Sequence, residues 1–91
     1  MKTKQQAMES FQQIPGVGNK IAEDFWNIGL RQTEYLKGAD PQYLYGKLCK
    51  YQHTKVDICM LYVLRCAIYY ASEENPDPQL LKWWLWKDRI L

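Results

Sequence analysis

The chain has 91 residues and a mass of 10.9 kDa, with 47% hydrophobic, 24% charged and 14% aromatic residues. A chain of this length buries roughly 60–65% of its unfolded surface, enough for one modest core but not for a deep substrate pocket as well. We therefore expect a single domain over residues 1–91 that is not an enzyme. Twelve Lys and Arg against ten Asp and Glu give a net charge of +2, which indicates a nucleic-acid partner only if the basic residues gather locally.

The cysteine count and the N-terminal residues indicate the compartment. Three cysteines are an odd number at low density, and the first ten residues have a basic start with no apolar stretch after it. The longest apolar stretch, 58–71, is interrupted by Arg65 and is shorter than the roughly 20 residues that cross a membrane. We expect a reduced, cytoplasmic protein with no membrane partner and a structural role for Arg65.

Apolar spacing and glycine positions predict two helices in the first third of the chain. An apolar stripe predicts a helix over about 4–13. A second helix is predicted with Asn19 as its cap and with Gly29 in the left-handed position that follows its end. Between them lies the sequence Ile-Pro-Gly-Val-Gly at 14–18. The sequence thus predicts a helix, a tight glycine turn and a helix within about 4–29.

The remainder of the chain, about 30–91, is also predicted to be helical. Thr33 is suited to cap a single turn that ends at Leu36. Asp40 at a cap and Pro at the next position predict a helix that continues to about Gln52. Its apolar stripe consists of Tyr43, Leu44, Leu48 and Tyr51.

Two further helices are predicted toward the C-terminus. Thr54 and Asp57 fit the capping pattern of Ser or Thr followed three residues later by an acid, so an apolar helix is predicted over about 55–72. The run Asn-Pro-Asp-Pro at 75–78 ends it, and a tryptophan-rich helix is predicted over about 79–89. No strand competes, so the expected fold is all-α, one compact domain of five to six short helices.

The glycine turn is suited to bind a phosphate. Gly16 and Gly18 permit close approach of a partner to the backbone. The amides at the start of the next helix have no acceptor inside that helix, and their partial positive charge adds to that of Lys20. Such contacts hold a nucleic-acid backbone but read no bases. The candidate phosphate-binding residues are Gly16, Val17, Gly18, Asn19 and Lys20.

Apolar residues extend this pattern on both sides of the turn. The stretch reads Phe11-x-x-Ile14-Pro15-Gly16-Val17-Gly18-x-x-Ile21-Ala22-x-x-Phe25. Over about fifteen positions it resembles the helix-hairpin-helix motif of DNA-binding proteins, whose hairpin grips the phosphate backbone without sequence specificity. The resemblance implies a non-enzymatic protein that binds double-stranded DNA independently of sequence. The alternative is a helical hairpin that only packs.

The rest of the chain carries a second resemblance. Its residues are Asp40-Pro-x-x-Leu44-Tyr45-x-x-Leu48-Cys49, then Val56-Asp57-x-Cys59-x-Leu61-Tyr62-Val63-x-Arg65-Cys66-Ala67-x-Tyr69-Tyr70-Ala71, and finally Leu81-Lys82-Trp83-Trp84-x-Trp86. Over nearly the full length the chain is similar to the small bacterial pathogenicity-locus proteins. That family is described as carrying a helix-hairpin-helix, and some members bear a mitomycin-resistance label. The resemblance implies no established activity.

Two lysines are candidates for further phosphate contacts. Lys47 and Lys50 are three residues apart on one predicted helix, in a stretch without Asp or Glu between Asp40 and Asp57. The alternative is that they are simply solvated. Because a single hairpin makes few phosphate contacts, useful affinity would require a second hairpin or a dimer.

The tryptophans suggest a function from a different class. Trp83, Trp84 and Trp86 wrap around their predicted helix, and aromatic residues are enriched at interface hot spots. They are a candidate interface with a protein partner or a second copy of the chain. In this alternative the protein is an adaptor or homo-oligomer and the hairpin is purely structural. A competing interpretation places the tryptophans in a groove between the other helices.

Four residues raise the question of a zinc site, namely Cys49, His53, Cys59 and Cys66. Seven residues of helix separate Cys59 from Cys66 by about 10.5 Å, too far for both thiolates to reach one ion or to form a disulfide. Asp40, at the place where DNA glycosylases carry a catalytic Asp, is better explained as a helix cap. We expect no metal, no cofactor and no catalytic residue.

Overall fold

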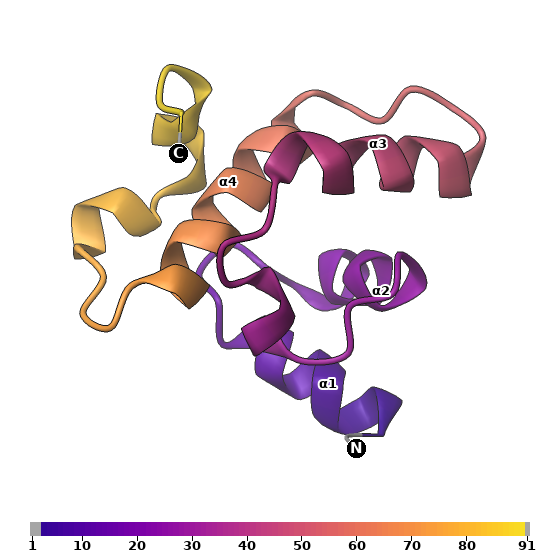
Figure 1. Ribbon diagram of the computed structural model, residues 1–91, viewed down its shortest axis with the longest axis horizontal. Coiled ribbons are helices and arrows are strands. Elements are labelled where there is room, and N and C mark those ends of the chain that lie inside the picture. The colour runs from indigo at the N-terminus through magenta and orange to yellow at the C-terminus, as the bar shows by residue number, and fades with distance from the viewer. Residues whose placement is uncertain (1–2, 91) are drawn as a thin grey trace.

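The computed structural model describes residues 3–90, which contain helices and no strand (Figure 1). The α-helices are α1 (Lys4–Gln12), α2 (Asn19–Asn27), α3 (Pro41–Gln52) and α4 (Cys59–Ser72). The 3₁₀ turns are η1 (Thr33–Leu36), η2 (Pro78–Leu81) and η3 (Trp83–Lys87). The all-helical class is confirmed. The expected count of five to six helices is wrong, since the described residues form four α-helices and three short 3₁₀ turns.

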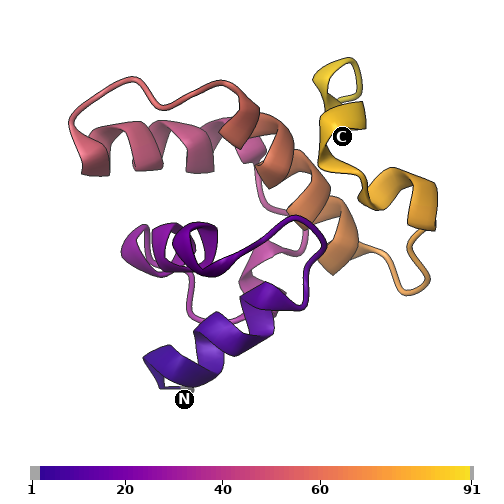
Figure 2. The same cartoon turned by 180° about the vertical axis from the view of Figure 1, so that it is seen from behind.

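Helix α4 is the central element, with α3 on one side and the C-terminal segment on the other (Figures 1 and 2). It also packs against η1. Buried side chains occupy most of its circumference, as expected for an apolar helix in a core. They are Met60, Leu61, Val63, Leu64, Cys66, Ala67 and Ile68.

The predicted start of this helix is wrong. Helix α4 begins at Cys59, not near residue 55. The Cys59 amide donates a hydrogen bond of 2.8 Å to the carboxylate of Asp57. Asp57, and not Thr54, therefore satisfies a backbone donor at the helix start.

The continuous helix predicted over 79–89 is also wrong. Lys82 has an extended backbone, with φ −89° and ψ 104°, between η2 and η3. The indole N–H of Trp86 donates to the carbonyl of Leu80 at 2.8 Å, and Nη1 of Arg65 donates to the carbonyl of Trp86 at 2.8 Å. These bonds fold the segment back on itself and onto α4, and they satisfy the carbonyls of Leu80 and Trp86 without a continuous helix. The structural role expected of Arg65 is this contact.

The local signals around α3 are partly confirmed. Asp40 caps α3 by accepting a 2.9 Å bond from the Gln42 amide, and the helix ends at Gln52 as predicted. The apolar stripe is wrong in part, because the side chains of Tyr43 and Tyr51 are 64% and 54% exposed. Leu44, Tyr45 and Leu48 are the buried residues. The short turn predicted over 33–36 is confirmed, but it is preceded by Gln32 and has no side-chain cap.

Helices α1 and α2 pack against each other through an aromatic pair. The rings of Phe11 and Phe25 are fully buried and meet edge to face, with centroids 5.5 Å apart and an interplanar angle of 81°. Ile14 and Val17, which flank the turn between the helices, are also buried. The turn is thus anchored in the core by a buried side chain before it and another after it.

The turn itself requires glycine at position 16. The Val17 amide donates to the carbonyl of Ile14 at 3.0 Å, with Pro15 second in the turn and Gly16 third at φ +86°. This is the residue pattern of a type II β-turn. A Cβ on Gly16 would lie 2.9 Å from Cδ1 of Trp83, so the indole leaves no room for a side chain.

Replacing Gly16 with alanine should destabilise the protein. The alanine must hold a positive φ and push the Trp83 indole aside, so the free energy of unfolding in urea should fall by about 1–3 kcal/mol. Gly38 is the matched control, because its φ of +69° is also positive but a Cβ there meets nothing within 4 Å. Gly38→Ala should lower the free energy of unfolding by about 1 kcal/mol, from the positive φ alone. Equal effects of the two substitutions would contradict the packing of Trp83 on the turn.

Candidate functional site

The start of α2 is open. Gly18 is its N-cap, with an extended backbone at φ −93° and ψ −168°, and the Ala22 amide is the first to bond back to it, at 3.0 Å. The intervening amides find no acceptor within the helix. No side chain of residues 3–90 caps them. A Cβ on Gly18 would meet nothing within 4 Å, so the space beside the N-cap residue is open.

Asn19 was expected to cap α2, and this is wrong. It is the first residue of the helix, and its side-chain oxygen accepts a hydrogen bond of 3.4 Å from Gln12 at the end of α1. Asn19 therefore contributes its backbone amide to the open helix start, while its side chain links the two helices.

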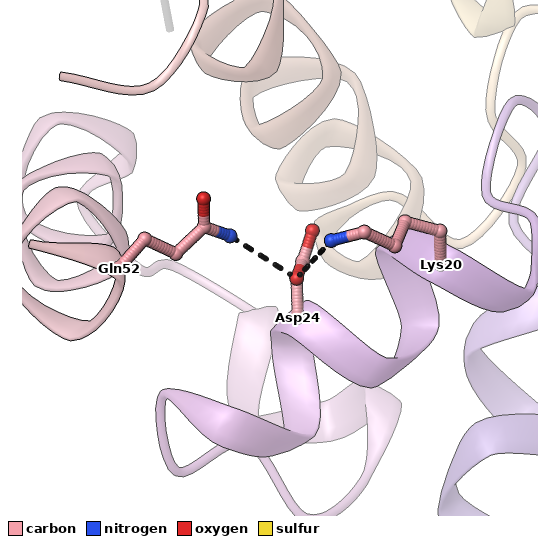
Figure 3. A network of polar contacts seen from close by, with 3 residues as sticks. All are labelled: Lys20, Asp24 and Gln52. Atoms are coloured by element: carbon pink, nitrogen blue, oxygen red, sulfur yellow. Dashed lines mark hydrogen bonds and ion pairs between the residues drawn. The ribbon is translucent and has the colours of Figure 1, made fainter. Parts of the chain in front are cut away.

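Lys20 lies one turn before a buried acid (Figure 3). Its ammonium is 3.3 Å from Oδ1 of Asp24, and the side chains of Lys20 and Asp24 are 82% and 11% exposed. The side-chain amide of Gln52 donates to the same oxygen at 3.3 Å, which ties α2 to α3. This is the only ion pair within residues 3–90. This pair was not predicted, although the i, i+4 spacing of Lys20 and Asp24 is visible in the sequence.

The five predicted phosphate-binding residues are thus not equivalent. Gly18 and the two residues after it present amides at the start of α2. Val17 is buried, and its amide already donates within the turn, so it anchors the turn. Gly16 lies against Trp83. Of the five, Gly18, Asn19 and Lys20 have backbone amides without an acceptor at the start of α2.

The structure does not bring Lys47 and Lys50 to the glycine turn. Both are exposed on α3, and Nζ of Lys47 lies 3.7 Å from the position of a Cβ on Gly29. Gly29 follows the other end of α2, which is nine residues or about 13 Å long. Any role for these lysines is therefore at a separate place on the surface.

The three tryptophans of the predicted interface have different environments. Trp86 is 4% exposed and its ring packs on Tyr69, with centroids 5.3 Å apart. Trp83 is half-buried against the glycine turn. Trp84 is 56% exposed. Of the three, only Trp84 presents most of its side chain to a partner.

The cysteines lie in different surroundings. Cys49 is half-buried, Cys59 exposed and Cys66 buried, and His53 follows the last residue of α3 as an exposed residue with a positive φ of 55°. Within residues 3–90, no three His, Cys, Asp or Glu side chains gather closely enough to hold a metal ion. Burial raises the pKa of the Cys66 thiol to about 11.

This pKa gives the stability a pH dependence. The folded chain disfavours the Cys66 thiolate, whose ordinary pKa is 9.0, so the contribution of the buried thiol is intact below about pH 9 and is lost as the pH rises through about 11. Urea unfolding at pH 8 to 11 should therefore show a steeper loss of stability for the wild-type chain than for Cys66→Ala. Parallel profiles would contradict the assignment.

Within residues 3–90, no helix has the length and apolar character needed to cross a membrane.

The family model described as pathogenicity locus, Cdd1, matches residues 4–90. The chain therefore belongs to this family. Searches found no curated protein and no solved structure that matches the chain.

Proposed function

We propose that this member of the pathogenicity-locus family is a non-enzymatic protein that binds the phosphate backbone of double-stranded DNA without sequence specificity. In this proposal α1, the glycine turn and α2 form a helix-hairpin-helix unit. The phosphate is held by the amides of Gly18, Asn19 and Lys20 and by the Lys20 ammonium. The open N-cap at Gly18 is the observation that carries the proposal.

The glycine at position 18 has no structural requirement. Gly16 is demanded by a positive φ and by the neighbouring indole, whereas Gly18 has a φ of −93° that any residue adopts. A Cβ there meets no atom within 4 Å. Ser, Thr, Asp or Asn would cap α2 better than glycine. Close approach of a ligand to the backbone is a use that only glycine serves at this position.

The charge at this end of α2 also favours an anion. The helix start carries a partial positive charge, and the Lys20 side chain is 82% exposed beside it. The pair joins an exposed ammonium to a largely buried carboxylate, so a phosphate must compete with Asp24 for the Lys20 ammonium. Gln52 continues to donate to Asp24 when Lys20 turns to the ligand.

Substitutions at Gly18 test the proposal. Gly18→Asp should cap α2 and raise the free energy of unfolding by about 0.5–1 kcal/mol, while its carboxylate occupies the amides and repels phosphate. We expect anisotropy of a labelled random-sequence duplex to show wild-type binding with a log–log salt slope of about −2 to −4. In Gly18→Asp this binding should weaken at least tenfold. Gly18→Asn, which caps without charge, should weaken it less.

A charge-matched pair completes the experiment. Lys20→Gln should weaken duplex binding several-fold, whereas Lys87→Gln, which removes the same charge from the C-terminal segment, should not. Circular dichroism should show equal helical content in all variants. The proposal is wrong if the wild-type chain fails to bind the duplex at low salt, or if Gly18→Asp binds it as well as the wild type does.

A second candidate function is supported by the exposed C-terminal segment. Trp84, Leu85 and Ile90 are 56%, 41% and 85% exposed, which favours contact with a protein partner or a second copy of the chain. In that function the hairpin is purely structural. The Gly18 variants distinguish the two functions, because an adaptor would be stabilised by Gly18→Asp without any change in duplex binding.

A further inference from the structure

A cleft of about 450 Å³ lies between the C-terminal end of α2 and the outer face of α3. We call it the basic cleft. Its lining includes the cations Arg31, Lys47 and Lys50 together with Asn27, Gly29 and Tyr51. These residues come from two helices and from the segment after α2.

Three cations meet in the basic cleft without an acid. No Asp or Glu lines it, and the one ion pair within residues 3–90 is Lys20–Asp24 at another place. Mutual repulsion of Arg31, Lys47 and Lys50 opposes this arrangement in the free protein. A bound anion would relieve it.

Arg31 is already held in place. Its guanidinium lies 3.8 Å from the centroid of the Trp26 ring, and its Nη1 donates to the carbonyls of Trp26 and Leu30 at 2.7 and 3.3 Å. No acceptor among residues 3–90 engages its Nε and Nη2. Two parallel donors on a fixed guanidinium match two oxygens of a phosphate.

Glycine and tyrosine complete the cleft. Gly29 has a φ of +98° after α2, and Nζ of Lys47 lies 3.7 Å from the position that a Cβ on Gly29 would occupy, an ordinary contact distance. Tyr51 is 54% exposed instead of packing in the predicted apolar stripe. An exposed aromatic ring beside cations that bind phosphate is suited to stack on a base.

We propose that the basic cleft binds a nucleotide, with its phosphate on Arg31, Lys47 and Lys50 and its base against Tyr51. The nucleotide is either free or one unit of a nucleic-acid strand, since both present the same phosphate and base. The cleft lies at the opposite end of α2 from Gly18. This inference therefore does not depend on the proposed role of the glycine turn.

Nuclear magnetic resonance titration of the full chain tests the inference. The probes are thymidine 5′-monophosphate, thymidine without phosphate, and a single-stranded oligothymidylate hexamer. We expect saturable shifts of the Gly29 amide and the Arg31 Nε–H signals with a phosphate-bearing probe, and at least tenfold weaker binding of thymidine. Saturation by the monophosphate identifies a site that accepts free nucleotides, and saturation by the hexamer alone identifies a site for a strand.

Paired variants separate a site from general charge. Lys47→Gln with Lys50→Gln should weaken binding at least tenfold and leave the melting temperature unchanged or higher, because repulsion is relieved. Lys37→Gln with Lys87→Gln removes equal charge elsewhere and should change affinity less than twofold. Lys20→Gln should leave these titrations unchanged, so failure of the glycine turn and failure of the cleft are distinguishable. The inference is overturned by the absence of saturable shifts with both phosphate-bearing probes, by an equal response to thymidine, or by equal loss in the control pair.

Discussion

The contact between Trp83 and Gly16 joins the C-terminal segment to the turn that precedes α2. The turn accepts no side chain there, because a Cβ would lie 2.9 Å from the indole. Ile14 and Val17 hold the same turn in the core, and their burial fixes the direction in which α2 begins. The open amides at Gly18 are therefore presented by a rigid support and not by a free loop, as a binding site for phosphate requires.

Helix α2 carries both proposed sites, one at each end. Its N-terminal end offers amides and Lys20, and its C-terminal end, closed by Gly29, brings the Arg31 guanidinium next to α3. Between them Asp24 bonds to Lys20 and to Gln52 of α3, so the same carboxylate orients the first site and connects α2 to the helix that lines the second. A second phosphate contact near the C-terminal end of α2 would add to the affinity that a single hairpin supplies.

The sequence predicts what depends on local chemistry. Gly29 follows the end of α2 with a positive φ, and the amides of Gly29 and Leu30 donate to carbonyls in the last turn of the helix. Asp40 caps α3 through its own side chain. The C-terminal segment was mispredicted because its shape depends on bonds to Arg65 and to Leu80 that no local pattern reveals.

The two candidate sites also differ in whether they depend on local sequence or on helix packing. The glycine turn is a local feature that the sequence predicts, whereas the basic cleft depends on the packing of α2 against α3. The sequence pointed to Lys47 and Lys50 but gave no reason to join Arg31 to them.

The most direct measurement is a ¹H–¹⁵N spectrum of the wild-type chain titrated with an unlabelled random-sequence duplex. We expect saturable shifts at the amides of Gly18, Asn19 and Lys20; shifts confined to 84–90, or none, would contradict the proposed phosphate site.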